Sequence, residues 1–143
     1  MDGLLVVIAV MAVAGAFGVY RKRTDGRIKP IDTPMPSRPP GAGIGSLGEL
    51  GERGTIVQFS SAFCQPCKAA KAISTDIAKI VPGVKHIDID AESHLELVRN
   101  FNVMRTPTIF VLDAHGRVSA RISGVPRKDE LLVALDDRAA ENL

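Results

Sequence analysis

The first twenty residues differ from the rest of the chain in their pattern of hydrophobic and polar positions. Residues 3–20, GLLVVIAVMAVAGAFGVY, contain no charged side chain. As a helix they would span about 27 Å, which is close to the thickness of the hydrocarbon core of a bilayer. Tyr20 would lie at the interface, with a basic run at 21–23 just beyond it. The pattern predicts a transmembrane helix over residues 1–20.

Two other interpretations of this segment stay open. A cleaved signal peptide also has an apolar run, and it has small residues near its cleavage site, such as those at 12–16. A signal peptide normally begins with basic residues, whereas this chain places Asp2 beside the α-amino group. A buried core helix would have to pack against the domain through the proline-rich stretch that follows.

Residues 21–43 are predicted to form a linker. They contain five prolines and six basic residues. Proline lacks the N–H that the interior of a helix or sheet requires. The composition therefore predicts an extended, semi-stiff tether that leads into a globular domain over residues 44–143.

The globular part alternates the patterns of strands and helices. Apolar and β-branched runs predict strands at 55–59, 84–90, 108–112 and 118–122, and hydrophobic spacings of three and four predict helices at 65–80, 92–101 and from about residue 127. The order β-α-β-α-β-β-α predicts an α/β fold, with a parallel first pair and an antiparallel hairpin around residues 113–116. Helices would cover both faces of a central mixed sheet.

The distribution of charge distinguishes classes of partner and sides of a membrane. Residues 21–43 carry six basic and two acidic side chains, whereas residues 44–143 carry 12 basic and 13 acidic ones. The domain is nearly neutral, so we expect no nucleic-acid partner, which would need a basic face. Because lysine and arginine favour the cytoplasmic side, we expect the domain in the cytoplasm, with an extracytoplasmic location as the alternative.

The chain has two cysteines, Cys64 and Cys67, which lie after a predicted strand at the start of a predicted helix. A helix N-terminus carries positive partial charge, which lowers the pKa of a thiol there and favours the reactive thiolate. A spacing of three is short enough for Cys67 to attack a mixed disulfide on Cys64. Pro66 suits the first helical turn, where its missing N–H is not needed. The spacing therefore indicates a redox pair.

A metal site and a pair of unreactive thiols are the competing interpretations of the two cysteines. A structural zinc site usually needs four ligands. The chain has no second cysteine pair, and His86, His94 and His115 form no closely spaced pair. We therefore expect no metal and no cofactor other than the redox-active cysteine pair itself.

The motif and its surroundings resemble those of the thioredoxin family. Residues 63–68, FCQPCK, follow a strand and open a helix like the active site of that family. Residues 103–108, VMRTPT, are similar to the segment that contains its cis-proline. The resemblance covers about residues 50–140 and implies a thioredoxin-like fold after the N-terminal transmembrane helix.

The resemblance also implies roles for particular residues. Cys64 would be the nucleophile and Cys67 the resolving thiol. Thr106 and Pro107, joined by a cis bond, would hold the Thr106 backbone open to an extended substrate segment. The positions expected to support the site are Phe63, which keeps an apolar lid, Pro66, and Lys68.

Gln58 departs from the family pattern. Many members have a buried aspartate six residues before the first cysteine, where it assists proton transfer, whereas a glutamine can hydrogen-bond but cannot titrate. His86, on the neighbouring predicted strand, is the candidate substitute, and a structural role is its alternative. Phe63 and Gln65 also replace the commonest tryptophan and glycine, which leaves the redox potential open.

Together these features predict a membrane-tethered thiol–disulfide oxidoreductase that acts on protein disulfides or dithiols, as a reductant if the domain is cytoplasmic. Its partners would be protein substrates, an upstream electron donor and the lipid bilayer around residues 3–20. One alternative is an extracytoplasmic exchange protein for exported proteins or cytochrome c maturation. Another is a thioredoxin-like binding module with weak or no redox activity.

Overall fold

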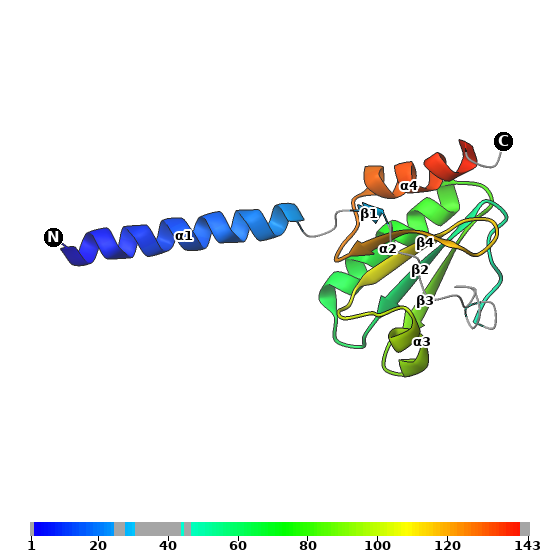
Figure 1. Cartoon of the computed structure of the whole chain (residues 1–143), viewed down its shortest axis with the longest axis horizontal. Helices are drawn as coiled ribbons and strands as arrows, with labels where there is room; N and C mark the ends of the chain where they lie inside the picture. Colours follow the sequence, from blue (N-terminus) through cyan, green and yellow to red (C-terminus); the bar gives the residue numbers. More distant parts are fainter. Residues whose placement is uncertain (1, 25–27, 31–43, 45–46, 141–143) are drawn as a thin grey trace.

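The computed structural model describes residues 2–24, 28–30, 44 and 47–140 of the 143-residue chain. The elements are α1 (Asp2–Thr24), β1 (Ile28–Pro30), β2 (Gly54–Ser60), α2 (Gln65–Ile80), β3 (Val84–Asp90), α3 (Leu95–Asn100), β4 (Thr108–Leu112), β5 (Val118–Ser123) and α4 (Lys128–Ala140). From β2 to α4 this is the predicted order β-α-β-α-β-β-α, which is therefore confirmed (Figure 1).

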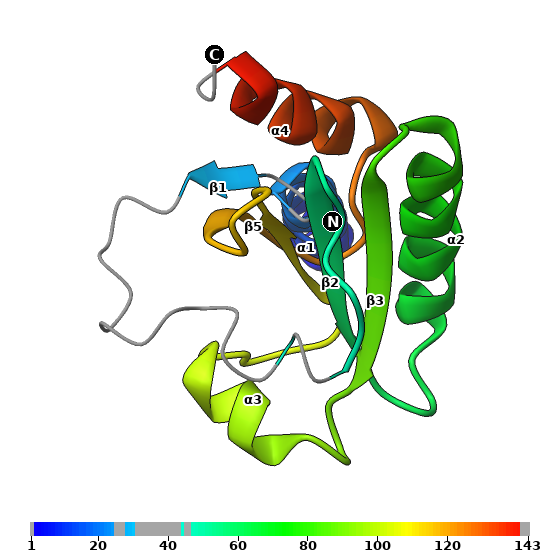
Figure 2. The ribbon, with the colours of Figure 1, turned by 90° about the vertical axis from the view of Figure 1, so that its right-hand side faces the viewer.

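The strands form one five-stranded sheet in the order β1-β5-β4-β2-β3. β2 and β3 are parallel, whereas β4 is antiparallel to both β2 and β5. The predicted parallel pair and the predicted hairpin are both confirmed. Figure 2 shows α2, α3 and α4 packed around this sheet, so the expected mixed sheet flanked by helices is also confirmed.

The two faces of the sheet carry separate hydrophobic cores, because successive side chains of a strand point to opposite faces. The core between the sheet, α2 and α4 contains Ile56, Ala70, Ile77, Ile109, Val111, Ala120, Ile122, Leu131 and Leu135. The core on the α3 face contains Ile44, Val57, Phe59, Ile89, Leu97, Phe101, Val103, Phe110 and Leu112. The second core includes three aromatic rings, of Phe59, Phe101 and Phe110, with centroids 5.1 to 5.8 Å apart.

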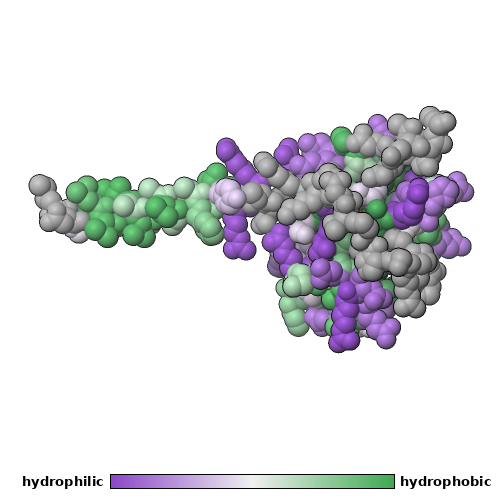
Figure 3. Space-filling view, in the orientation of Figure 1, coloured by the Kyte–Doolittle hydropathy of each residue, from purple (hydrophilic) through white to green (hydrophobic). Residues whose placement is uncertain are grey.

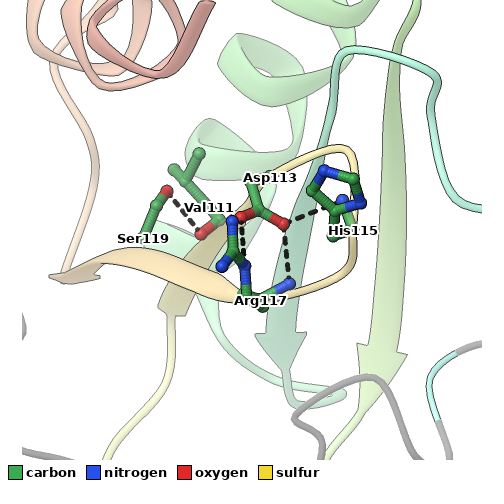
Figure 4. Close-up of polar contacts among 5 residues, drawn as sticks. All are labelled: Val111, Asp113, His115, Arg117 and Ser119. Atoms are coloured by element: carbon green, nitrogen blue, oxygen red, sulfur yellow. Dashed lines mark hydrogen bonds and ion pairs between the residues drawn. The ribbon is translucent and has the colours of Figure 1, made fainter. Parts of the chain in front are cut away.

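The turn between β4 and β5 is organised around Asp113 (Figure 4). Its carboxylate accepts hydrogen bonds from the backbone N–H groups of His115 and Arg117, both at 2.9 Å, and from Nε of Arg117 at 2.8 Å. Gly116 has a φ of 76°, which glycine adopts readily. Burial would raise the pKa of Asp113, but the hydrogen bonds from Arg117 and His115 hold that pKa below its usual value. The turn is therefore stabilised by an ionised, buried carboxylate.

β1 lies within the stretch 21–43, for which the composition predicts an extended, semi-stiff tether. Residues 28–30 instead pair antiparallel with β5, with Ile28 opposite Ile122 and Pro30 opposite Ala120. Proline is tolerated here because β1 is an edge strand, where one missing N–H need not break the ladder. The tether prediction is corrected at these three residues, and its positions 25–27 and 31–43 lie outside the described residues.

α1 runs to Thr24, past its predicted end at Tyr20, and belongs to neither core. Figure 3 shows it as a hydrophobic rod with hydrophilic side chains at its C-terminal end, where the basic residues 21–23 lie. Its length and composition allow it to cross a membrane, although a signal sequence would pass the same test. None of this segment is buried, which disfavours the core-helix interpretation.

Candidate active site

Cys64 and Cys67 form a disulfide at the start of α2, with their Cα atoms 5.2 Å apart. Cys64 is the N-cap residue of the helix, and its Sγ accepts a hydrogen bond from the backbone N–H of Cys67 at 3.2 Å. Pro66 occupies the first turn, where a helix does not use the N–H that proline lacks. Both cysteines therefore lie where the sequence pattern places them, after β2 and at the opening of a helix.

The surroundings of the two sulfur atoms are unequal. Cys64 is half-buried, whereas Cys67 is only 4% exposed. The first turn of α2 contains no acidic side chain, and Lys68 is exposed there. Because a helix N-terminus carries about half a positive charge, a thiolate on Cys64 would be stabilised. An external partner can thus reach Cys64, while Cys67 is sheltered beside it.

Gln58 is fully buried on β2 and contacts the second cysteine. Its Nε2 donates a hydrogen bond to the backbone carbonyl of Cys67 at 2.9 Å. Its Oε1 is buried and has no hydrogen-bond partner among the described residues. Since an amide neither gains nor loses a proton near neutral pH, position 58 supplies polarity to the site but no titratable group.

His86 lies further from the cysteine end of the sheet than Gln58 does. The β3 residue that pairs with Gln58 is Asp88, two positions beyond His86. Nδ1 of His86 lies 3.2 Å from Oγ1 of Thr75 on α2. Burial lowers the pKa of His86, the charge of Asp88 opposes this shift, and the charge of Lys71 reinforces it. The contact with Thr75 holds His86 against α2, and its part in proton transfer stays a prediction.

A polar network adjoins Gln58, and the sequence pattern contains no signal for it. The carboxylate of Asp88 accepts a hydrogen bond from the hydroxyl of Ser60 and forms an ion pair with Nζ of Lys71 at 2.9 Å. The three residues come from β3, β2 and α2, so only the pairing of the strands and the packing of the helix bring them together. No local sequence pattern marks Asp88, within the predicted strand 84–90, as part of the site.

The loop before β4 is connected to the cysteine loop. The Thr106–Pro107 peptide bond is cis, as the resemblance implies. The hydroxyl oxygens of Ser61 and Thr106 lie 3.1 Å apart, and the N–H of Cys64 donates to the carbonyl of Ser61 at 3.3 Å. The N–H of Gly124 donates to the carbonyl of Pro107 at 2.9 Å. Ser61, which no local sequence pattern marks as part of the site, thus links the two halves of the site.

Two large apolar side chains are exposed at this end of the sheet. Phe63, which precedes Cys64, is 100% exposed, and Met104, in the loop before Thr106, is 82% exposed. The expectation that Phe63 covers the cysteines as a lid is not met, because a fully exposed ring covers nothing. Met104 is absent from the sequence-based site, since a single apolar residue in a loop carries no distinguishing pattern.

This arrangement is suited to thiol–disulfide exchange. A thiolate at the reachable sulfur can attack a disulfide, and a second thiol three residues away can displace the mixed disulfide that forms. In the described part of the chain, no group of three or more His, Cys, Asp or Glu side chains could hold a metal ion.

Comparison of the sequence with known proteins gives the same family as the motif. A family model described as Thioredoxin matches residues 49–137. The chain is 24% identical over 81 residues to thioredoxin H5 of Oryza sativa subsp. japonica, covering 55% of this chain and 60% of the relative. It is 30% identical over 77 residues to an H-type thioredoxin of Oryza sativa subsp. indica, covering 53% of this chain and 61% of the relative. Both matches cover less than two thirds of the relative.

Comparison of the fold with solved structures agrees. The structure of Fasciola hepatica thioredoxin superposes with a TM-score of 0.54 at 23% identity, covering 62% of this chain and 83% of that one. Thioredoxin-2, described as a component of malaria parasite protein secretion machinery, superposes with a TM-score of 0.55 at 20% identity, covering 59% and 82%. At these identities the likeness supports the fold.

Proposed function

The chain belongs to the thioredoxin family, and on this premise we propose that it catalyses thiol–disulfide exchange with protein partners. The observation that carries the proposal is the unequal cysteine pair at the start of α2. Cys64 caps the helix and is reachable, whereas Cys67 is buried one turn in. The cis Thr106–Pro107 bond lies in a loop that contacts the cysteine loop through Ser61.

In the proposed reaction, the thiolate of reduced Cys64 attacks one sulfur of a disulfide in the partner. A mixed disulfide forms, and the other sulfur of the partner leaves as a thiolate and takes up a proton. Cys67 then loses its proton and attacks Sγ of Cys64, which releases the second thiol of the partner and closes the Cys64–Cys67 disulfide. Two electrons pass to the partner, and a dithiol donor must return them before the next cycle.

Reduction of insulin disulfides, with dithiothreitol or a thioredoxin reductase as the electron source, tests this activity. The wild-type chain is expected to accelerate precipitation of the insulin B chain. Failure of the wild type with both donors, although both thiols titrate, would contradict the proposal.

We also propose that α1 tethers the domain to a membrane. This is supported by the length of the exposed helix, by the absence of charged side chains over residues 3–20, and by Arg21, Lys22 and Arg23 in its last turn. The same basic residues favour a cytoplasmic domain, where the pair would act as a reductant. A reporter fused after Leu143 tests the side, and high alkaline phosphatase activity would contradict the cytoplasmic assignment. Appearance of a shortened chain in the soluble fraction would instead identify α1 as a signal peptide.

A thioredoxin-like binding module is the second candidate, because Gln58 gives the site no titratable group. This candidate predicts titratable thiols without insulin reduction. An exchange protein outside the cytoplasm, for exported proteins or cytochrome c maturation, keeps the same chemistry and differs in topology. The insulin assay and the reporter fusion therefore separate all three functions.

A further inference from the structure

We propose that the cysteine end of the sheet faces the bilayer from which α1 emerges, and that the substrates are disulfide-bearing segments of membrane proteins close to the bilayer surface. This inference rests on the proposed exchange activity and on α1 as a membrane span. It adds a limit on the distance between the cysteine pair and the bilayer, and a class of substrate. Neither the fold nor the cysteine motif supplies these.

The register of β1 carries the proposal. Ile28, the first residue of β1, pairs with Ile122, which pairs with Ile109, which in turn pairs with Gln58. One row of paired residues thus crosses the sheet from Ile28 to Gln58. Gln58 contacts the active site, since it donates a hydrogen bond to the carbonyl of Cys67. Figure 2 shows β1 at the edge of the sheet, beside β5.

The direction of β1 fixes the end at which the chain enters. Pro30, the last residue of β1, pairs with Ala120 in the row of Ile56, which precedes Gln58 on β2. β2 runs toward Ser60, and the cysteines follow it. The chain therefore joins the sheet near the cysteine end and runs toward the opposite end, where the Asp113 turn lies.

The connection between α1 and β1 is short. Only residues 25–27 separate Thr24 from Ile28, so the two Cα atoms can be at most about 14 Å apart. The three strand-to-strand steps from Ile28 to Gln58 add about 14 Å. A free tether over the whole of 21–43 would instead reach about 80 Å when extended. Because β1 pairs with the sheet, the connection between α1 and the domain is much shorter than the whole stretch 21–43 would allow.

The end of α1 marks the bilayer surface. Thr24 lies about 6 Å along the helix axis from Tyr20, which places it near the outer edge of the lipid headgroups. The two short steps from Thr24 then keep Gln58, which contacts Cys67, within about 30 Å of that surface. A disulfide at the membrane surface lies within this distance of the site at all times, whereas a soluble protein must first diffuse to it.

The exposed apolar side chains lie at the same end. Phe63 and Met104 flank the cysteine and cis-proline loops and contribute almost nothing to the described core. Segments next to a membrane are rich in apolar and aromatic residues, which these two side chains can contact. The occupant that fits this end is therefore a cysteine-bearing segment of a membrane protein adjacent to the bilayer.

The geometry is tested first by a measurement that does not depend on activity. In full-length Cys64→Ser/Cys67→Ser protein in nanodiscs, a fluorophore is attached at Lys68→Cys near the site or at His115→Cys in the opposite turn. We expect a quencher carried on lipid headgroups to reduce the emission from position 68 more strongly than that from position 115. Equal quenching, or stronger quenching at position 115, would overturn the proposed orientation.

The substrate class is tested with one disulfide peptide anchored to a transmembrane peptide in the same nanodisc. Polyproline spacers hold the disulfide about 10 Å or about 60 Å from the bilayer, at about 3.1 Å per residue. We expect wild-type protein to reduce the near disulfide about tenfold faster than the far one. The short connection keeps the cysteine pair near the bilayer, so its effective concentration is lower at the far disulfide. Equal rates, with insulin still reduced, would overturn this inference and leave the exchange activity standing.

A pair of insertions provides the matched control. About 20 Gly-Ser residues inserted after Gly26 lengthen the connection to β1 and are expected to abolish the preference for the near disulfide. The same insertion after Pro36, beyond β1, is expected to preserve it. Retention of the preference after the Gly26 insertion would overturn the role of the short connection. No insulin reduction by any form would overturn the exchange activity and this inference with it.

Discussion

The two ends of the sheet are built in opposite ways from the same strands. At the hairpin end, the buried carboxylate of Asp113 accepts three hydrogen bonds. At the cysteine end, Phe63 and Met104 are exposed, and the buried Oε1 of Gln58 has no partner among the described residues. Satisfied polar groups stabilise a fold, whereas exposed apolar and unsatisfied polar groups do not. The comparison shows that the candidate reactive groups and the hydrogen-bonded Asp113 turn lie at opposite ends of the same strands.

The largest expected effect is loss of activity at the cysteine end. Cys64→Ser removes the nucleophile and is expected to abolish insulin reduction. Cys67→Ser leaves the nucleophile without its resolving thiol, so a mixed disulfide with the substrate should accumulate and be detectable by mass spectrometry. Stability of the reduced proteins should change by less than about 1 kcal/mol. Normal turnover by Cys64→Ser would break the assignment of this end as the reactive one.

The converse effect is expected at the hairpin end. Asp113→Ala leaves the donors of His115 and Arg117 without their acceptor and should lower the free energy of unfolding by about 2–4 kcal/mol. Asp113→Asn keeps one acceptor oxygen and should cost less. Urea denaturation measures the loss, and insulin reduction well below the melting temperature should stay at the wild-type rate. A loss of rate without a loss of stability would contradict the separation of the two ends.

Gln58→Glu gives the cysteine end the buried acid that it lacks. Burial should raise the folded-state pKa of this glutamate above its unfolded value, so stability is fully present at low pH and is lost as pH rises through the folded pKa. We expect about 2 kcal/mol or more to be lost between pH 5 and pH 8. Gln58→Met is the matched control without a titrating group. A flat pH dependence in the glutamate variant, measured by denaturation, would mean that position 58 is solvated.

A smaller pH effect is expected from His86, which lies between the two ends. Its folded-state pKa is lowered, chiefly by burial, so its contribution is fully present above the unfolded pKa of about 6.5 and is lost as pH falls through the folded pKa. His86→Gln should therefore show a smaller loss of stability than wild type between pH 7.5 and pH 5. An unchanged pH profile of insulin reduction would support the structural role of His86, and a shifted one would support its role in proton transfer.

The smallest effect on stability is expected at Phe63. Because its ring is fully exposed, Phe63→Ala should change the free energy of unfolding by no more than about 0.5 kcal/mol. If the ring contacts substrates, the KM for a protein disulfide should rise while the rate with a small disulfide stays the same. Leu132 on α4, which is also exposed, offers a control. Leu132→Ala should change neither the KM for a protein disulfide nor the rate with a small disulfide.

Most of the fold could be predicted from local sequence patterns. The strand at 55–59, the helix at 65–80 and the hairpin around 113–116 depend on periodicity and turn residues that are adjacent in the chain. The stretch 21–43 could not be predicted in this way, because its prolines argue against sheet interiors and say nothing of an edge position at 28–30. The polar contacts of Asp88 with Ser60 and Lys71 were equally out of reach, since they join three separate elements.

The sequence by itself determines the chemistry of the site. A strand, a three-residue cysteine spacing and a helix start that accepts Pro66 are all local, and they place one thiol at the positive end of a helix dipole. Non-local pairing decides the rest, because the register between strands depends on the packing of the whole sheet. That register aligns Ile28 with Gln58 and brings the entering chain to the cysteine end. The motif therefore carries the proposed exchange chemistry, and the tertiary structure sets the distance between α1 and the cysteine end of the sheet.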